Sequence, residues 1–310
     1  MLPVLAVIAA AVLFGTTGTS QALGPDGTTP LGVGVARLAI GGSGLALAAL
    51  PLAIRARRRT RAHAEAPPRF TPGAVALMAA TGVCLALYQP LFFLGTARNG
   101  VAMGTVIALG SAPVLAGLLE WSLTRRRPTG WWILATALAT VGVALLAGSG
   151  GFSTSGTDPL GILGSIGAGA SFAVFANIQR RLIDRGWDPF TVVAAMGASS
   201  GLVGIAAVPF VDLSWMSTPG GLVMALWLGL GTTSLAYILF TWGLTSLTAA
   251  TAATLTLAEP LTATLLGLVV LGERLAPLAL LGIGVLAAGL VVLAWSSRAH
   301  RNPPAVPLEV

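Results

Sequence analysis

The sequence has few of the side chains that a soluble protein keeps on its surface or that an enzyme uses for chemistry. Among its 310 residues there is no Lys, one Cys and two His, and charged residues make up only 9% of the chain. The single Cys84 excludes an intrachain disulfide and a metal site built from several thiolates. So low a share of charge excludes a water-soluble domain of this size. The chain must therefore be solvated by lipid.

Long apolar runs fill most of the chain. Hydrophobic residues make up 55% of it, and the mean hydropathy is +0.88. A helix needs about 20 apolar residues to cross the hydrocarbon core of a bilayer, and runs of about that length recur from end to end. The predicted transmembrane helices are 3–23, 31–54, 72–95, 99–121, 130–148, 159–179, 190–210, 220–242, 247–271 and 276–296. The first run has no basic residue before it and no obvious cleavage site, so we interpret it as a retained helix rather than a signal peptide.

All 17 basic residues are Arg, and the formal net charge is +7. A basic protein can bind nucleic acid, but here the arginines form no single face with interleaved aromatics. They gather in every second predicted loop, as Arg55, Arg57, Arg58, Arg59, Arg61, Arg69, Arg125, Arg126, Arg127, Arg180, Arg181, Arg185, Arg298 and Arg301. Positive charge marks cytoplasmic loops. The pattern predicts a multi-pass protein of the plasma (inner) membrane with both termini in the cytoplasm and no nucleic-acid partner.

The second half of the chain repeats the first at an offset of 147 residues. This offset pairs Pro113 with Pro260, Arg127 with Arg274 and Gly142 with Gly289. The sequence thus predicts one five-helix repeat over 1–150, a second over 151–297 and a short cytoplasmic tail over 298–310. Since five is odd, the second repeat must cross the membrane in the opposite sense. Inverted repeats of this kind are a common construction of secondary transporters, with the substrate held where the halves meet.

Several short motifs, taken together, resemble the drug/metabolite transporter superfamily, and specifically its EamA type. They are Phe14-Gly15, Ala36-Arg37, Pro113, Glu259-Pro260 and Leu271-Gly272-Glu273-Arg274. The resemblance covers about 3–296. It implies an all-α membrane protein of ten helices in two inverted five-helix repeats around a central cavity, lined largely by helices 1, 3, 4, 6, 8 and 9. It also implies export of amino acids or other small metabolites. The first repeat departs from the pattern, because Arg125-Arg126-Arg127 stands where the second has Gly-Glu-Arg.

Four residues within the predicted spans stand out. Pro113 and Pro260 should bend their helices, which either exposes carbonyls to a cavity or only shapes the bundle. Glu259 is the one carboxylate near the middle of a predicted span and should not face lipid. It is either a protonatable group that couples proton movement to transport, or a hydrogen-bonded tie to a neighbouring helix. Arg37 either attracts a substrate carboxylate, or reaches the interface or an acidic partner.

Polar and aromatic side chains in the spans that the family uses for its cavity are the predicted substrate contacts. They are Thr16, Thr17, Ser20, Tyr88, Gln89, Ser111, Ser171, Asn177, Thr233, Tyr237, Trp242 and Thr254. A lone Ser or Thr in a membrane helix more often bonds to its own helix or to a neighbouring one. Such a lining would suit an uncharged or zwitterionic amphipathic solute.

The leading hypothesis from the sequence is a secondary transporter of a small organic molecule, driven by gradients, with no cofactor and no metal. Two alternatives remain at this point. An intramembrane enzyme would need clustered His, Asp or Ser near an interface, but His63 and His300 both fall in predicted cytoplasmic segments. A structural or helper protein would only assemble with partners. The oligomeric state is left open.

Overall fold

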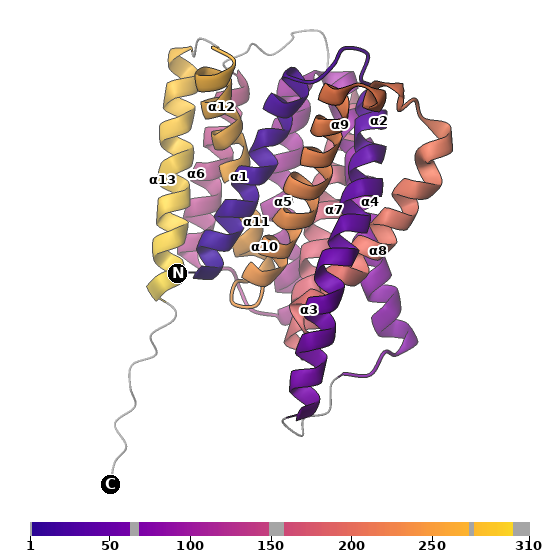
Figure 1. Ribbon diagram of the computed structural model, residues 1–310. Coiled ribbons are helices and arrows are strands. Elements are labelled where there is room, and N and C mark those ends of the chain that lie inside the picture. Colours follow the sequence, from indigo (N-terminus) through magenta and orange to yellow (C-terminus); the bar gives the residue numbers. More distant parts are fainter. Residues whose placement is uncertain (1, 63–67, 149–157, 273–275, 300–310) are drawn as a thin grey trace.

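The computed structural model describes residues 2–62, 68–148, 158–272 and 276–299. Within these ranges the chain forms helices joined by short connections, without a strand, and the long helices stand side by side as one upright bundle (Figure 1). The expectations for Glu273, Arg274, His63, His300 and the final residues lie outside the described part. The all-α fold is confirmed.

The elements follow one another along the chain with little between them. They are α1 (Leu2–Ala22), α2 (Pro30–Ala36), η1 (Arg37–Gly42), α3 (Ser43–Ala62), α4 (Pro72–Asn99), α5 (Val101–Thr124), α6 (Gly130–Gly148), α7 (Pro159–Asp184), α8 (Pro189–Ala207), η2 (Val208–Phe210), η3 (Ser214–Ser217), α9 (Pro219–Leu226), η4 (Trp227–Leu235), α10 (Ala236–Gly243), α11 (Ala249–Leu255), α12 (Ala258–Val270) and α13 (Pro277–Ala299).

Ten of the described helical segments are long and apolar enough to cross a membrane. Four of these spans are composite: α2, η1 and α3 form the second, α8 and η2 the seventh, α9, η4 and α10 the eighth, and α11 and α12 the ninth. Large apolar side chains are exposed on the outside of the bundle, for example Val269 at 77% and Leu202 at 68%. Such a surface is stable in lipid and not in water. The protein is therefore a multi-pass membrane protein, as its composition predicts.

Five of the spans begin with the same two-residue signal, a Thr or Asp followed by Pro. The pairs are Thr29-Pro30, Thr71-Pro72, Asp158-Pro159, Asp188-Pro189 and Thr218-Pro219. In each pair the first side chain accepts a hydrogen bond from a backbone N–H of the first turn. Proline suits the next position because its missing N–H would have no partner there. These caps explain why the predicted starts of the five spans lie within a residue of the observed ones.

Two of the capping carboxylates lie in different surroundings. Arg98 at the end of α4 donates a hydrogen bond of 2.7 Å to Asp158, which holds the pKa of Asp158 below its usual value. Burial instead raises the pKa of Asp188. The Arg98–Asp158 pair connects the third span to the start of the sixth.

Both α1 and α13 have their terminal ends at the same end of the bundle (Figure 1). We call this the terminal end and the opposite one the far end. The connections after α3, α5, α7 and α10 lie at the terminal end, and they hold or adjoin the described arginine clusters. Arg98 lies at the far end. Connections that are rich in arginine along the chain thus lie together at one end of the bundle.

The two halves meet in a near-symmetric crossing of α6 and α13. A Cβ placed on Gly142 would lie 2.5 Å from the backbone nitrogen of Leu286, and one placed on Gly289 would lie 2.8 Å from that of Ala139. The offset of 147 residues converts Gly142 into Gly289 and Ala139 into Leu286. Gly142 therefore contacts the equivalent of Ala139, and Ala139 contacts the equivalent of Gly142. Such reciprocal contacts occur across a two-fold axis. With five spans on each side, this axis relates halves of opposite orientation.

Candidate substrate-binding cavity

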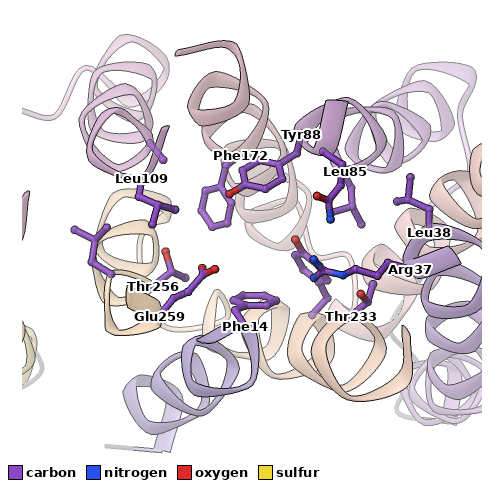
Figure 2. Close-up of a pocket in the computed structure, with 14 residues that line it drawn as sticks. Phe14, Arg37, Leu38, Leu85, Tyr88, Leu109, Phe172, Thr233, Thr256 and Glu259 are labelled. Carbon is purple, nitrogen blue, oxygen red and sulfur yellow. The ribbon is translucent and has the colours of Figure 1, made fainter. Parts of the chain in front are cut away.

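A cavity lies inside the bundle where both halves contribute helices. Its volume is about 60 Å³, and its lining comes from α1, η1, α4, α5, α7, η4, α10 and the ninth span (Figure 2). A second hollow of about 120 Å³ continues it toward the far end. The two share Arg37, Tyr88, Gln89, Leu109 and Glu259 in their linings, so we treat them as one cavity.

The ninth span is interrupted where it reaches this cavity. Thr256 and Leu257 separate α11 from α12, and both line the cavity. Pro260 has no N–H to donate to the carbonyl four residues earlier, that of Thr256, and its ring would clash with that carbonyl. The carbonyl of Thr256 accepts from the N–H of Glu259 at 2.9 Å instead. The bend that the sequence predicts at Pro260 is thus a local interruption of the helix one turn earlier, with Pro260 in the first turn of α12.

Pro113 has a weaker effect on its helix. It lies inside α5, which continues from Val101 to Thr124 without a break. The carbonyl of Leu109, which a donor at position 113 would normally satisfy, belongs to a residue that lines the cavity. The paired prolines of the two halves therefore both act beside the cavity, but only the second interrupts its helix.

Glu259 reaches into the cavity from the first turn of α12. An acidic side chain is favoured at a helix N-terminus, because the backbone N–H groups there carry partial positive charge. No hydrogen bond or ion pair joins its carboxylate to another described residue. The hypothesis of a hydrogen-bonded tie to a neighbouring helix therefore has no contact to support it within the described ranges.

Arg37 enters the same cavity from the opposite side (Figure 2). It is the first residue of η1, a π-helical segment, and such segments often occur at functional sites. Its Nε atom is buried and has no hydrogen-bond partner in the described structure. Arg37 lies with the cavity groups rather than at the membrane interface, and its guanidinium makes no ion pair with any described carboxylate.

Aromatic rings lie on the side of the cavity that faces the terminal end. Tyr237 packs on Phe14 with ring centroids 5.1 Å apart, and Phe172, Phe175, Tyr237 and Phe240 form a connected cluster of rings. Phe175 and Phe240 are fully buried. We call these four residues the aromatic layer. On α7, Phe175 of this layer lies between Phe172, which lines the cavity, and Asn177, which lines another hollow.

This other hollow, which we call the vestibule, has a volume of about 530 Å³ and lies at the terminal end. Charged side chains of both signs line it, among them Glu120, Arg126 and Arg180. Arg180 of α7 donates to the backbone carbonyls of Leu244 and Leu247 after α10. Glu120 of α5 accepts from the N–H of Ala250 at 2.9 Å, at the start of α11. Both contacts join spans that also line the cavity.

The structure brings together five of the twelve predicted substrate contacts in the cavity, together with the predicted coupling residue. Thr17, Tyr88, Gln89, Thr233, Tyr237 and the coupling candidate Glu259 line the cavity. Asn177 lies beyond the aromatic layer and lines the vestibule, where its amide donates to the carbonyls of Ala116 and Ala173. The remaining six lie outside both linings.

Five of these six side chains form hydrogen bonds within the bundle. Ser20, Ser111 and Ser171 donate to carbonyls of their own helices, as is usual for such residues in membranes. Thr16 accepts a hydrogen bond of 3.0 Å from the indole of Trp227. Thr254 is fully buried and lies 3.0 Å from the hydroxyl of Thr136. The sixth, Trp242, is partly buried in α10.

Comparisons with known proteins agree with this architecture. The model of the EamA-like transporter family matches residues 1–148 and again residues 159–295. The chain belongs to this family. The uncharacterized transporter YwfM of Bacillus subtilis (strain 168) is 41% identical over 302 residues, 96% of each chain. The threonine/homoserine exporter RhtA of Escherichia coli (strain K12) is 30% identical over 251 residues, 70% of this chain and 79% of that one.

A solved crystal structure confirms the fold of this EamA-like chain. It aligns with a TM-score of 0.74 at 19% identity and covers 97% of this chain and 99% of that one. The resemblance identified from short motifs in the sequence is thus correct, and the protein is a membrane transporter by family. Within the described ranges no group of three or more His, Cys, Asp or Glu side chains could hold a metal ion.

The sequence missed several residues of the EamA-like cavity. Phe14, Leu109 and Phe172 are apolar and cannot be told from core residues by pattern alone. Thr256 and Leu257 enter the lining because the ninth span is interrupted one turn before Pro260, the residue at which the sequence predicts a bend. The family expectation named helices 1, 3, 4, 6, 8 and 9, whereas the second span also contributes, through Arg37 and Leu38. The signal available in the sequence was the presence of an arginine within an apolar run.

Proposed function

We propose that this protein is a secondary transporter that exports a small metabolite, such as an amino acid or an amphipathic drug-like solute, by alternating access. The observation that carries the proposal is a cavity between two inverted halves, lined by a cation and a carboxylate and bordered by an interrupted helix. Transporter sites near the midplane are typically formed by such discontinuous helices. The name of the relative RhtA supports amino acids as the substrate class and export as the direction.

In this proposal the terminal end faces the cytoplasm of a cell whose plasma membrane holds the protein. The support is the excess of arginine at that end, since basic residues are retained on the cytoplasmic side. The vestibule is then the cytoplasmic entrance and the aromatic layer is the inner gate. A substrate would enter from the vestibule when the layer opens and leave from the cavity toward the far end.

Cysteine labelling tests this orientation. In a Cys84→Ser background, single cysteines at Arg58 and Arg126 should be protected from a membrane-impermeant thiol reagent in intact cells. A cysteine at Asp212, in a far-end connection, should be labelled. All three should react once the cells are made permeable. If the cysteines that replace Arg58 and Arg126 are labelled from opposite sides of the membrane, both the orientation and the inverted repeat are contradicted.

Transport itself is tested with purified protein in proteoliposomes. Vesicles that contain unlabelled threonine should accumulate labelled threonine faster than empty vesicles do, because exchange through one cavity carries the label inward. A helper protein would move no label, and an enzyme would convert it to another compound. Failure with amino acids, nucleosides and organic cations alike would overturn the proposed function.

Proton coupling through Glu259 is part of the proposal. The carboxylate lines the cavity beside Arg37, Tyr88 and Tyr237, and these are the titratable groups that face it. If Glu259 takes up a proton as substrate leaves, an imposed pH gradient should drive net movement in the wild type and not in Glu259→Gln. If Glu259→Gln keeps full activity and an unchanged pH profile, Glu259 has no coupling role, and the transport function still stands.

A further inference from the structure

We infer that the cavity binds the zwitterionic head group of an α-amino acid, with Arg37 holding the carboxylate and Glu259 the ammonium. This inference rests on the proposed function, since it names the chemistry by which that same cavity selects its substrate. Its basis is the placement of two opposite charges in one cavity without contact between them.

The guanidinium of Arg37 lacks a partner of its own. Its Nε atom is buried and makes no hydrogen bond to a described residue, and no described carboxylate lies within ion-pair distance. A cation in such surroundings is costly unless an anion compensates it. Arginine presents a planar fork of donors that matches a carboxylate in two parallel hydrogen bonds. A substrate carboxylate would meet both requirements.

Glu259 faces Arg37 across the cavity rather than pairing with it (Figure 2). Two opposite charges inside a bundle of membrane-spanning helices would gain much from direct contact, because the local dielectric constant is low. Here α12 and η1 hold them on opposite walls, and the rings of Phe14 and Tyr88 lie between those walls (Figure 2). A group that carries both charges fits this arrangement, with its carboxylate toward Arg37 and its ammonium toward Glu259.

The other walls suit a short side chain. Leu85, Leu109 and Phe172 supply apolar surface, whereas Thr233 and Gln89 supply hydrogen-bonding groups. One water molecule needs about 10–15 Å³ of such volume, so a cavity of about 60 Å³ holds roughly four to six waters. With the adjoining hollow of about 120 Å³, the space is sufficient for a small amino acid.

Solutes with one charge should bind less well. A purely anionic solute would leave the negative charge of Glu259 without a partner. A purely cationic solute would leave the positive charge of Arg37 without one. Sites built around buried charges discriminate strongly against ligands that leave one of them unpaired. The two charges together therefore select for the dipolar ion.

Three ligands and two variants test the assignment. The ligands are L-threonine, L-threonine amide, which lacks the carboxylate, and N-acetyl-L-threonine, which lacks the ammonium. Binding is measured by the rise in melting temperature of the purified protein and by competition in threonine exchange. We expect each derivative to bind at least about tenfold more weakly than threonine to the wild type, a difference of about 1.4 kcal/mol.

The variants should show crossed effects. Arg37→Gln should weaken threonine binding at least tenfold and leave the amide unchanged. Glu259→Gln should weaken threonine equally and leave the N-acetyl derivative unchanged. Damage to the fold would affect all three ligands alike and lower the melting temperature without ligand. Arg185→Gln and Asp26→Asn make the same chemical changes at exposed positions away from the cavity and should bind all three as the wild type does.

Two results would overturn the inference. One is equal binding of threonine and its amide to the wild type, and the other is an Arg37→Gln variant that loses all three ligands in proportion. If none of the three binds but a nucleoside or an organic cation is transported, the head-group assignment is wrong and the transporter function stands. If nothing is transported, the proposed function itself fails.

Discussion

Replacing Gly142 by Leu should leave little folded protein. Gly142 lies where α6 crosses α13, and even a Cβ there would come within 2.5–2.7 Å of the backbone nitrogen, Cα and Cβ of Leu286. Backbone atoms cannot rotate out of the way, so the two helices would have to separate along one of the contacts that join the halves. Overpacking of this kind costs about 3 kcal/mol or more. Size-exclusion profiles and melting temperatures of the detergent-solubilised protein measure the loss.

Gly284→Leu is the matched control. Gly284 lies on α13 as well, but no heavy atom lies within 4 Å of a Cβ built on it, so a leucine there would extend into lipid. This variant should fold as the wild type does. Equal yields and melting temperatures for the two leucine variants would show that the crossing does not hold the halves together.

Removing the ring of Phe240 should both destabilise the protein and make it leak. The side chain is fully buried and contacts the rings of Phe172 and Phe175, at centroid distances of 5.6 and 5.9 Å. Truncating a buried phenylalanine to alanine costs about 3–5 kcal/mol. The space left would also connect the cavity with the vestibule. We therefore expect Phe240→Ala to have a lower melting temperature and to release labelled solute from proteoliposomes without a counter-substrate.

Two further variants separate the gate from general stability. Phe210→Ala truncates a phenylalanine that is 85% exposed, and it should change neither property. Phe240→Leu keeps most of the volume and should restore much of the seal. A Phe240→Ala protein that is destabilised but still passes solute only in exchange would remove the aromatic layer from its role as a gate.

Most of the fold could be predicted because its signals are local. Spans that begin at pairs such as Thr71-Pro72 or Asp158-Pro159 carry their own start signal, and apolar runs of sufficient length define the rest. The pairing of Gly142 with Gly289 came from an offset in the sequence, and the structure shows these two residues at equivalent points of one crossing. Length, capping and internal similarity are all readable without knowledge of the packing.

The site was harder to predict because it depends on how helices deviate from regularity. Arg37 faces the cavity from a π-helical segment, and nothing in the residues of η1 distinguishes it from a regular helix. Thr256 joins the lining because the helix breaks there, four residues before the proline that causes the break. Hydroxyl residues such as Ser111 had the right type and the right span but use their hydrogen bonds within the helix. Which face of a span meets the cavity is decided by tertiary packing.

The crossing of α6 and α13 also dictates an order of assembly. These are the last helices of their respective halves, so the ridge of Ala135, Ala139 and Gly142 leaves the ribosome with its partner still more than a hundred residues away in the sequence. Until Pro277–Ala299 has been synthesised and inserted, that ridge can only face lipid or some temporary neighbour. A chain that ends before Pro277 would therefore lack this one of the contacts between the halves.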